Sequence, residues 1–168
     1  MKKLLISAAM TTMFGAMVPA AQAATTVSQP FNVTVTLTSV CTMAAIGDLA
    51  FGTYVAFQPG IQTATPTTAT LTCTRGLTGV LAAFDTAAPG STAAAAAANA
   101  VGAGVIQGLQ YDITATPGTV VAGAAATASF IGGADTRPYS ITGTMPANQA
   151  GNPAQNTSPQ QRTLTITY

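Results

Sequence analysis

The side chains that carry acid–base and nucleophilic chemistry are scarce in this chain. Of its 168 residues four are acidic, all of them aspartates, and none is histidine. General acids and bases are usually His, Glu or paired Asp, and Asp48, Asp85, Asp112 and Asp135 share no motif. A serine nucleophile needs a neighbouring base such as histidine. We therefore expect a protein that is not an enzyme and that has no catalytic residue, cofactor or metal site.

The few charges also restrict the partners. Residues 24–168 carry three arginines and four aspartates and no lysine, a formal net charge of −1. Such a surface offers no cationic patch to nucleic acid or to anionic lipid, so we expect neither partner. It also lacks the mixed charges that keep free monomers soluble, which favours a protein packed against copies of itself.

The two cysteines, Cys41 and Cys73, are the only thiols. An even pair in an exported domain predicts a disulfide, worth roughly 3–4 kcal/mol in the chain-entropy description. A metal-bound pair is the alternative, but the spacing fits no zinc motif and no histidine completes one.

Residues 1–23 have the pattern of a signal peptide. Lys2 and Lys3 precede an apolar stretch, residues 4–18, and Ala21-Gln22-Ala23 forms an A-x-A cleavage site. The apolar stretch is too short to span a bilayer, so a retained anchor is the weaker alternative. We expect export and a mature chain that starts near Ala24 and does not insert into a membrane.

The elements that must position any site are strands. Apolar and polar residues alternate with a period of two over Phe31–Leu37, which is typical of a half-buried strand. The same pattern predicts strands at 49–57, 68–74, 77–84, 109–113, 119–122, 127–131, 139–146 and 162–168. Residues 93–98 and 147–161 are expected to be loops, the former with one helical turn as the alternative. Short strands separated by turn signals, with no amphipathic helix, predict an all-β sandwich.

Both ends of the mature chain read as strands with little edge protection. Edge strands are usually blunted by charge, proline or a covering loop, and here Pro30 and Arg162 alone could serve. The first strand can pair inside its own domain or be lent to another molecule. The residues themselves leave both uses open.

Several ordered segments resemble one family. They are Phe31-Asn32-Val33, Cys41, Leu49-Ala50-Phe51-Gly52, Leu71-Thr72-Cys73-Thr74-Arg75-Gly76, Leu109-Gln110-Tyr111-Asp112, Tyr139-Ser140-Ile141-Thr142-Gly143-Thr144-Met145-Pro146 and Thr163-Leu164-Thr165-Ile166-Thr167-Tyr168. Together they resemble the spore coat protein U domain family, which includes archaic chaperone–usher pilins of the Csu type. The chain departs from the family pattern at Ser158-Pro159-Gln160-Gln161 and in having no Trp, and residues 87–104 do not align.

The resemblance implies an incomplete immunoglobulin-like sandwich that lacks its last strand and is completed by a donor strand from a neighbouring subunit. Residues 24–38 would be the donor extension and residues 39–168 the pilin domain. The donor side chains would be Phe31, Val33, Val35 and Leu37. The C-terminal strand bordering the groove and contacting the chaperone would contain Leu164, Ile166 and Tyr168.

The partners implied are homologous subunits of a homopolymer, a periplasmic chaperone and an outer-membrane usher, with strand addition as the mode of binding. The function implied is that of a structural subunit of a surface pilus or fimbria that supports adhesion or biofilm formation. The alternatives are a spore or cell-surface coat protein of the same fold and a self-contained secreted β-sandwich that acts as a binding module.

Overall fold

The computed structural model describes residues 27–168. The chain divides into two units, Met1–Thr36 and Leu37–Tyr168, and the second contains all the strands of the described part. The expected signal peptide, residues 1–23, lies outside the described residues. The strands are β1 (Cys41–Met43), β2 (Gln62–Thr63), β3 (Thr67–Cys73), β4 (Leu81–Phe84), β5 (Thr92–Ala93), β6 (Ala100–Ile106), β7 (Leu109–Pro117), β8 (Asp135–Met145) and β9 (Leu164–Thr167).

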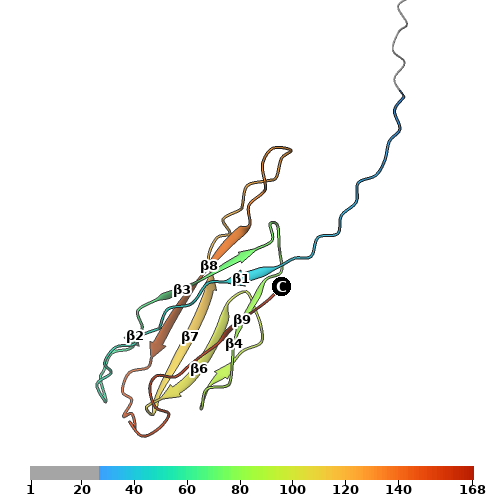
Figure 1. The fold of residues 1–168 in the computed structure, drawn as a ribbon. Coiled ribbons are helices and arrows are strands. Elements are labelled where there is room, and N and C mark those ends of the chain that lie inside the picture. The colour runs from blue at the N-terminus through green and yellow to red at the C-terminus, as the bar shows by residue number, and fades with distance from the viewer. Residues whose placement is uncertain (1–26) are drawn as a thin grey trace, which may run out of the picture. The chain divides into compact units, whose positions relative to one another are not determined.

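The strands form two antiparallel sheets in a sandwich-like arrangement (Figure 1). The larger sheet has the order β1-β3-β8-β7-β6-β5, and β2 pairs with the end of β8. The smaller sheet consists of β4 and β9. No residue from 27 to 168 is helical. The predicted all-β class is thus confirmed.

Alternation along the long strands builds the core. Every second residue of β3, from Ala69 to Cys73, is buried, and β7 and the second half of β8 repeat this pattern. Since successive strand residues point to opposite faces, these strands present one apolar face to β4 and β9. The largest fully buried side chain is Tyr139.

Two expected strands, at 49–57 and 77–84, are shorter than their patterns suggest. Between 49 and 57 a single bridge, Ala50–Thr65, is formed, and Val55 and Phe57 are exposed. Phe57 adopts a left-handed conformation with φ 61°, which breaks the strand. The expected strand at 77–84 is reduced to β4, with Ala82 and Phe84 facing inward in place of Leu81. In these segments turns override the alternation.

The predictions of strands at 119–122 and 127–131 are wrong. These residues form a hairpin-like excursion between β7 and β8 that holds isolated bridges rather than strands. Figure 1 shows it projecting beyond the end of the larger sheet. Its alanines and glycines give too little side-chain contact to extend the ladder.

Four observed strands, β1, β2, β5 and β6, are missing from the prediction. The longest of them, β6, contains two glycines, and glycine disfavours strands. The reason for glycine is a close approach. A Cβ atom at Gly104 would overlap the ring of Tyr111 on β7, so the ring can lie across β6 only where β6 has no side chain. The Ala-rich segment before β6 is mostly irregular, and the loop at 147–161 is confirmed.

Residues 27–40 form no strand. The alternating side chains of this segment, Val27, Phe31, Val33, Val35 and Leu37, are all exposed. A single chain therefore does not use this segment as a strand of its own sandwich. In the described part, no helix is long and apolar enough to cross a membrane.

Candidate functional site

The C-terminal strand β9 has a partner on one edge only. Over the described residues it pairs with β4 alone, in the register Leu81 to Thr167 and Phe84 to Leu164. The other edge of β4 is covered by a bridge between Ala82 and Ala97. The smaller sheet is therefore open at β9, and the strand that would extend it is not supplied by residues 27–168.

Backbone geometry shows which groups face that open edge. Ala82 donates its N–H to the carbonyl of Ala97 at 2.8 Å and accepts the N–H of Ala97 at 3.0 Å. Opposite residues in an antiparallel ladder exchange both hydrogen bonds or neither. Ile166, which lies opposite Ala82, therefore bonds to neither and directs its N–H and C=O away from β4. Unpaired strand groups of this kind are a template for another strand.

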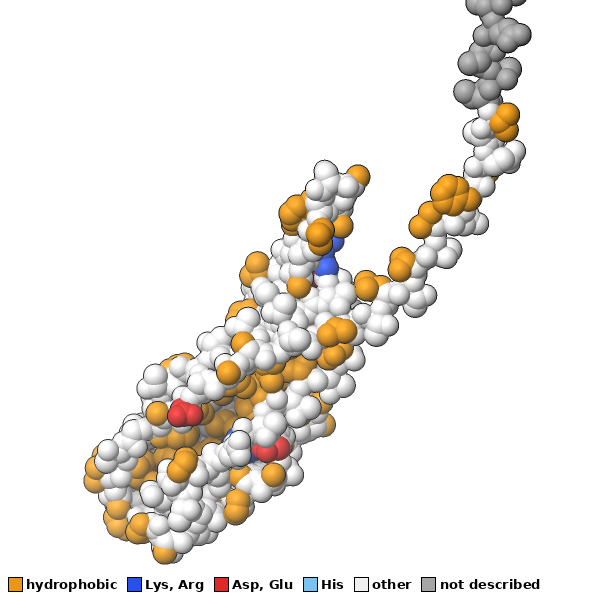
Figure 2. Space-filling view, viewed as in Figure 1, with side chains coloured by type: hydrophobic (Ala, Val, Ile, Leu, Met, Phe, Trp, Pro, Cys, Tyr) orange, Lys and Arg blue, Asp and Glu red, His pale blue; other side chains and the backbone are white. Residues whose placement is uncertain are grey.

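An apolar furrow accompanies the open edge. Figure 2 shows apolar side chains exposed along the domain, between β9 and the segment that leads from β1 to β2. The half-buried apolar side chains that pack against the core include Ile46, Leu49, Phe51 and Tyr54, from the segment between β1 and β2, and Ile166 of β9. A strand added beside β9 would cover such side chains, as well as pairing with its backbone.

The C-terminal side chains follow the predicted alternation. Leu164 is buried in the core, Ile166 is half-buried, and Tyr168 is exposed. The furrow thus becomes more open toward the end of the chain. The predicted C-terminal strand is present as β9, whereas no described contact tests its predicted roles in bordering a donor groove and in binding a chaperone.

The start of β9 is held by one guanidinium. Arg162 Nε lies 3.1 Å from Asp85 Oδ1, and Nη2 donates to the Asp85 carbonyl at 2.7 Å. Nη1 donates to the carbonyl of Ala103 at 3.0 Å and to Tyr111 Oη at 3.1 Å. The Arg162 side chain is 10% exposed. One side chain therefore ties β9 to β4 and, across the sandwich, to β6 and β7.

The environment of Asp85 favours its charged form. Partial burial alone would raise its pKa, but hydrogen bonds from the Thr163 backbone and from Arg162 outweigh burial and hold the pKa below its ordinary value. Tyr111 Oη also donates to Gln160 Oε1. Gln160 Nε2 in turn donates to the carbonyl of Val105 at 3.2 Å, which links the 147–161 loop to the same network.

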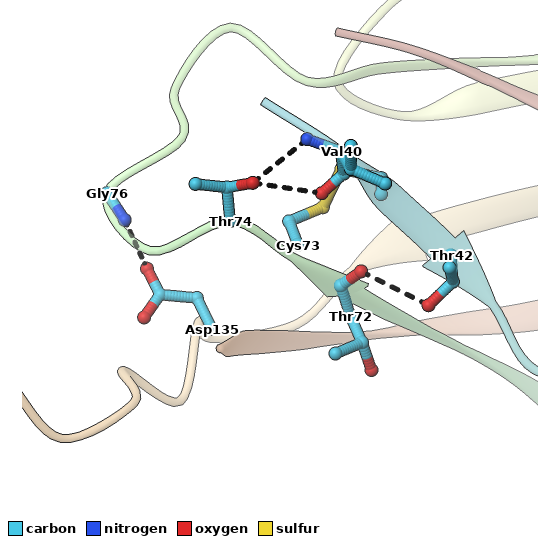
Figure 3. The surroundings of a disulfide bond; sticks show 8 residues. Val40, Thr42, Thr72, Cys73, Thr74, Gly76 and Asp135 are labelled. Atoms are coloured by element: carbon cyan, nitrogen blue, oxygen red, sulfur yellow. Dashed lines mark hydrogen bonds between the residues drawn. A yellow bond between two sulfur atoms is a disulfide. The ribbon is translucent and has the colours of Figure 1, made fainter. Parts of the chain in front are cut away.

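The predicted disulfide is present at the start of the domain. Cys41 and Cys73 are bonded with an S–S distance of 2.01 Å and lie opposite each other in the pairing of β1 with β3. Thr74 Oγ1 accepts the N–H of Val40 at 2.9 Å beside the bond (Figure 3). The point where the N-terminal segment joins the domain is thereby fixed to β3.

No group of metal-ligating side chains occurs in the described part of the chain. A cleft of about 640 Å³ lies between residues 85–89 and the 156–163 loop. Its lining contains Asp85 as the sole titratable side chain. Arg162 already pairs with this carboxylate, so the open edge of β9 is the stronger candidate for a functional site.

The fold and this edge define a class: a disulfide-bonded antiparallel sandwich whose smaller sheet, among the described residues, consists of two strands and is open at β9. Comparison with known families agrees with this class. The Spore Coat Protein U domain matches residues 27–159, and the chain belongs to that family, whose members are pilin-type structural subunits. No curated protein and no solved structure gives a significant match.

Sequence reasoning found the disulfide and the C-terminal strand and overlooked the Arg162 network. A signal for this ion pair was present in the sequence. Arg162 and Asp85 are two of the seven charged residues of 24–168; Asp85 directly follows β4 and Arg162 lies just before β9. In a chain with so few charges, an arginine beside an apolar strand must find buried acceptors. The predicted donor side chains, Phe31, Val33, Val35 and Leu37, are exposed.

Proposed function

We propose that this protein is a structural subunit of a surface pilus or fimbria, assembled through the chaperone–usher route by donor-strand exchange. The segment 24–38 of one copy fills the furrow beside β9 of the next. The observation that carries the proposal is that one chain has both an open strand edge, at β9, and an exposed segment with alternating apolar residues.

The donor side chains match the acceptor in kind. Phe31, Val33, Val35 and Leu37 occupy alternate positions, so an extended segment presents all four on one face. Burying four such side chains contributes on the order of 6–12 kcal/mol, as an upper estimate before ordering costs. Each backbone hydrogen bond to the edge adds about 1 kcal/mol net. An association of this size holds a filament without covalent links.

The contact is head-to-tail, because the segment that one copy lends differs from the edge of the next copy that receives it. Such contacts do not close on themselves and produce linear fibres. Before assembly the open edge needs protection against uncontrolled pairing. We infer that a periplasmic chaperone covers β9 and that an outer-membrane usher exchanges it for the donor of the next subunit, after export directed by residues 1–23.

Fibres of this kind would support adhesion or biofilm formation at the cell surface. A spore or cell-surface coat built by the same strand exchange is the second candidate. The family's description as a Spore Coat Protein U domain supports this candidate. Both share the donor and the acceptor and differ in where the polymer is found. Immunogold labelling of intact cells separates filaments from a continuous coat.

The proposal is tested by comparing the mature protein with a variant that lacks residues 24–38. We expect the full form to make fibres or multimers that resist detergent and the shortened form to stay monomeric. Addition of a synthetic 24–38 peptide should convert the shortened form to a one-to-one complex with a higher melting temperature. Two identical, stable monomers would instead support a self-contained secreted domain.

A further inference from the structure

The hairpin between β7 and β8, residues 120–134, is the other unusual surface of the domain and is called the arm below. No charged residue lies between Asp112 and Asp135. Val121, Phe130 and Ile131 are exposed, Ile131 to 92%. Figure 2 shows apolar side chains on the projecting arm, separate from the furrow. Exposed apolar clusters on a soluble domain commonly mark interaction surfaces.

The arm is a defined hairpin. Thr127 and Phe130 exchange backbone hydrogen bonds at 3.0 and 3.3 Å near the tip, and Gly133 donates to the Ala124 carbonyl at 2.9 Å. Nearer the root, a Cβ atom at Gly123 would overlap the carbonyl of Gly133. The two sides of the hairpin therefore pack closely because one of them is glycine.

The root of the arm is anchored by charged groups. Asp135 accepts the N–H of Gly123 at 2.8 Å and the N–H of Gly76 at 2.7 Å, and Arg75 Nε donates to the Gly123 carbonyl at 2.9 Å. These two backbone N–H groups hold the pKa of Asp135 below its ordinary value. The arm is thus fixed to the turn that follows β3.

That turn is also where the N-terminal segment joins the domain. Thr74, the residue before Arg75, hydrogen-bonds the backbone of Val40 on both sides, through its N–H at 2.9 Å and its hydroxyl at 2.9 Å. Figure 3 shows Val40, Thr74, Gly76 and Asp135 around the disulfide. The arm and the exit of the N-terminal segment therefore share one end of the sandwich.

The connection from this end to the donor residues is short. Thr38, Ser39 and Val40 alone separate Leu37 from Cys41, and an extended chain covers at most about 14 Å over those four steps. The arm covers roughly 13 Å from Gly123 to Thr127 at the rise of a strand. A copy that binds Leu37 is therefore held within about 14 Å of Cys41, at the end of the sandwich that carries the arm.

We propose that the arm packs against the neighbouring copy of this chain, the one that receives its donor segment, and forms a second contact at each subunit junction. This inference rests on the proposed function. The uncharged arm suits a partner that carries seven charges after its leader, because no charged group has to be desolvated. The second contact restricts rotation about the short connection and so stiffens the fibre.

The test replaces Phe130 by the photo-crosslinking residue p-benzoyl-phenylalanine in the full mature chain. Val101, which is 46% exposed on β6 of the larger sheet, is the matched control position. Fibres are irradiated and then dissociated by boiling in detergent. We expect a ladder of covalent dimers and longer species from position 130, several-fold more than from position 101.

The outcomes separate this inference from the proposed function. Fibres that form normally but give no ladder from position 130 overturn the arm contact and leave strand donation standing. A parent chain that forms no fibres overturns both. As a second measurement, fibres carrying Ile131→Ser should have a several-fold shorter persistence length in electron micrographs, with unchanged binding of the 24–38 peptide to the shortened domain. Unchanged stiffness would also contradict the contact.

Discussion

Ile166 lies directly opposite Ala82 in the β4–β9 pair, yet Ala82 gives both of its backbone hydrogen bonds to Ala97. The N–H and C=O of Ile166 therefore point away from β4, in the plane of the sheet, toward an edge that residues 27–168 leave without a partner strand. The same chain carries an exposed segment with the alternation that such an edge accepts. Under the proposed function, these two features are complementary between copies rather than within one.

A charge in the donor segment should block polymerisation and leave the domain intact. Val35 is 92% exposed in the single chain, so Val35→Asp removes no intramolecular contact. In the furrow it would bury a carboxylate beside apolar groups, which is strongly unfavourable. We expect monomers on size-exclusion chromatography with an unchanged melting temperature. Thr34→Asp, on the opposite face of the segment, is the control and should polymerise; normal fibres from Val35→Asp would refute the donor assignment.

Loss of the disulfide should lower the stability of the domain. The bond joins residues separated by 32 positions, so its removal should cost roughly 3–4 kcal/mol in the chain-entropy description. Urea unfolding of Cys41→Ser/Cys73→Ser, followed by fluorescence of the tyrosines, measures the change. A variant whose midpoint equals that of the parent would show that the bond does not stabilise the fold.

Arg162 should be needed to hold β9 in place. Arg162→Gln leaves the Asp85 carboxylate and several carbonyls without their donor, and we expect a loss on the order of 2–3 kcal/mol. Arg162→Lys keeps the charge but cannot reach Asp85 and Ala103 together, so it should recover part of that loss. Both are measured by urea unfolding. Equal stability of Arg162→Gln and the parent would contradict the clamp.

The same pair predicts acid sensitivity with a definite sign. The pKa of Asp85 is lower in the folded protein than its ordinary value, so its stabilising effect is complete above about pH 3.9 and is lost as the pH falls through the folded pKa. The melting temperature of the parent should drop below about pH 4. Asp85→Asn should start lower at pH 7 and drop less steeply; parallel curves would show that Asp85 is not the group responsible.

A strand is predicted correctly from the sequence where the strands that pair with it carry the same apolar–polar alternation. The alternation of β3, β7 and β8 is satisfied by long-range partners with the same pattern, so their prediction is confirmed. The segment around Phe57 has alternation but a left-handed residue ends it. Glycine-rich β6 has no pattern, and its strand arises from pairing with β7.

One part of the candidate site could be predicted from the sequence and another part could not. Leu164 and Ile166 could be placed on a strand from their spacing alone. The absence of a partner on the far edge of β9 could not, because it depends on which strands reach the smaller sheet. The contacts of Arg162 likewise depend on loops far apart in the chain, from Asp85 to Tyr111, which no local pattern specifies.

Amide hydrogen exchange of β9 tests strand addition most directly. The sample is the Val35→Asp monomer, before and after addition of the unaltered 24–38 peptide. The Ile166 amide faces the open edge and should exchange fast in the monomer, whereas the Thr165 amide, which alternates toward β4, is already protected and serves as the internal control. The account predicts that the peptide slows exchange at Ile166 by orders of magnitude. Exchange at Ile166 that stays fast in the presence of bound peptide would contradict donor-strand addition at β9.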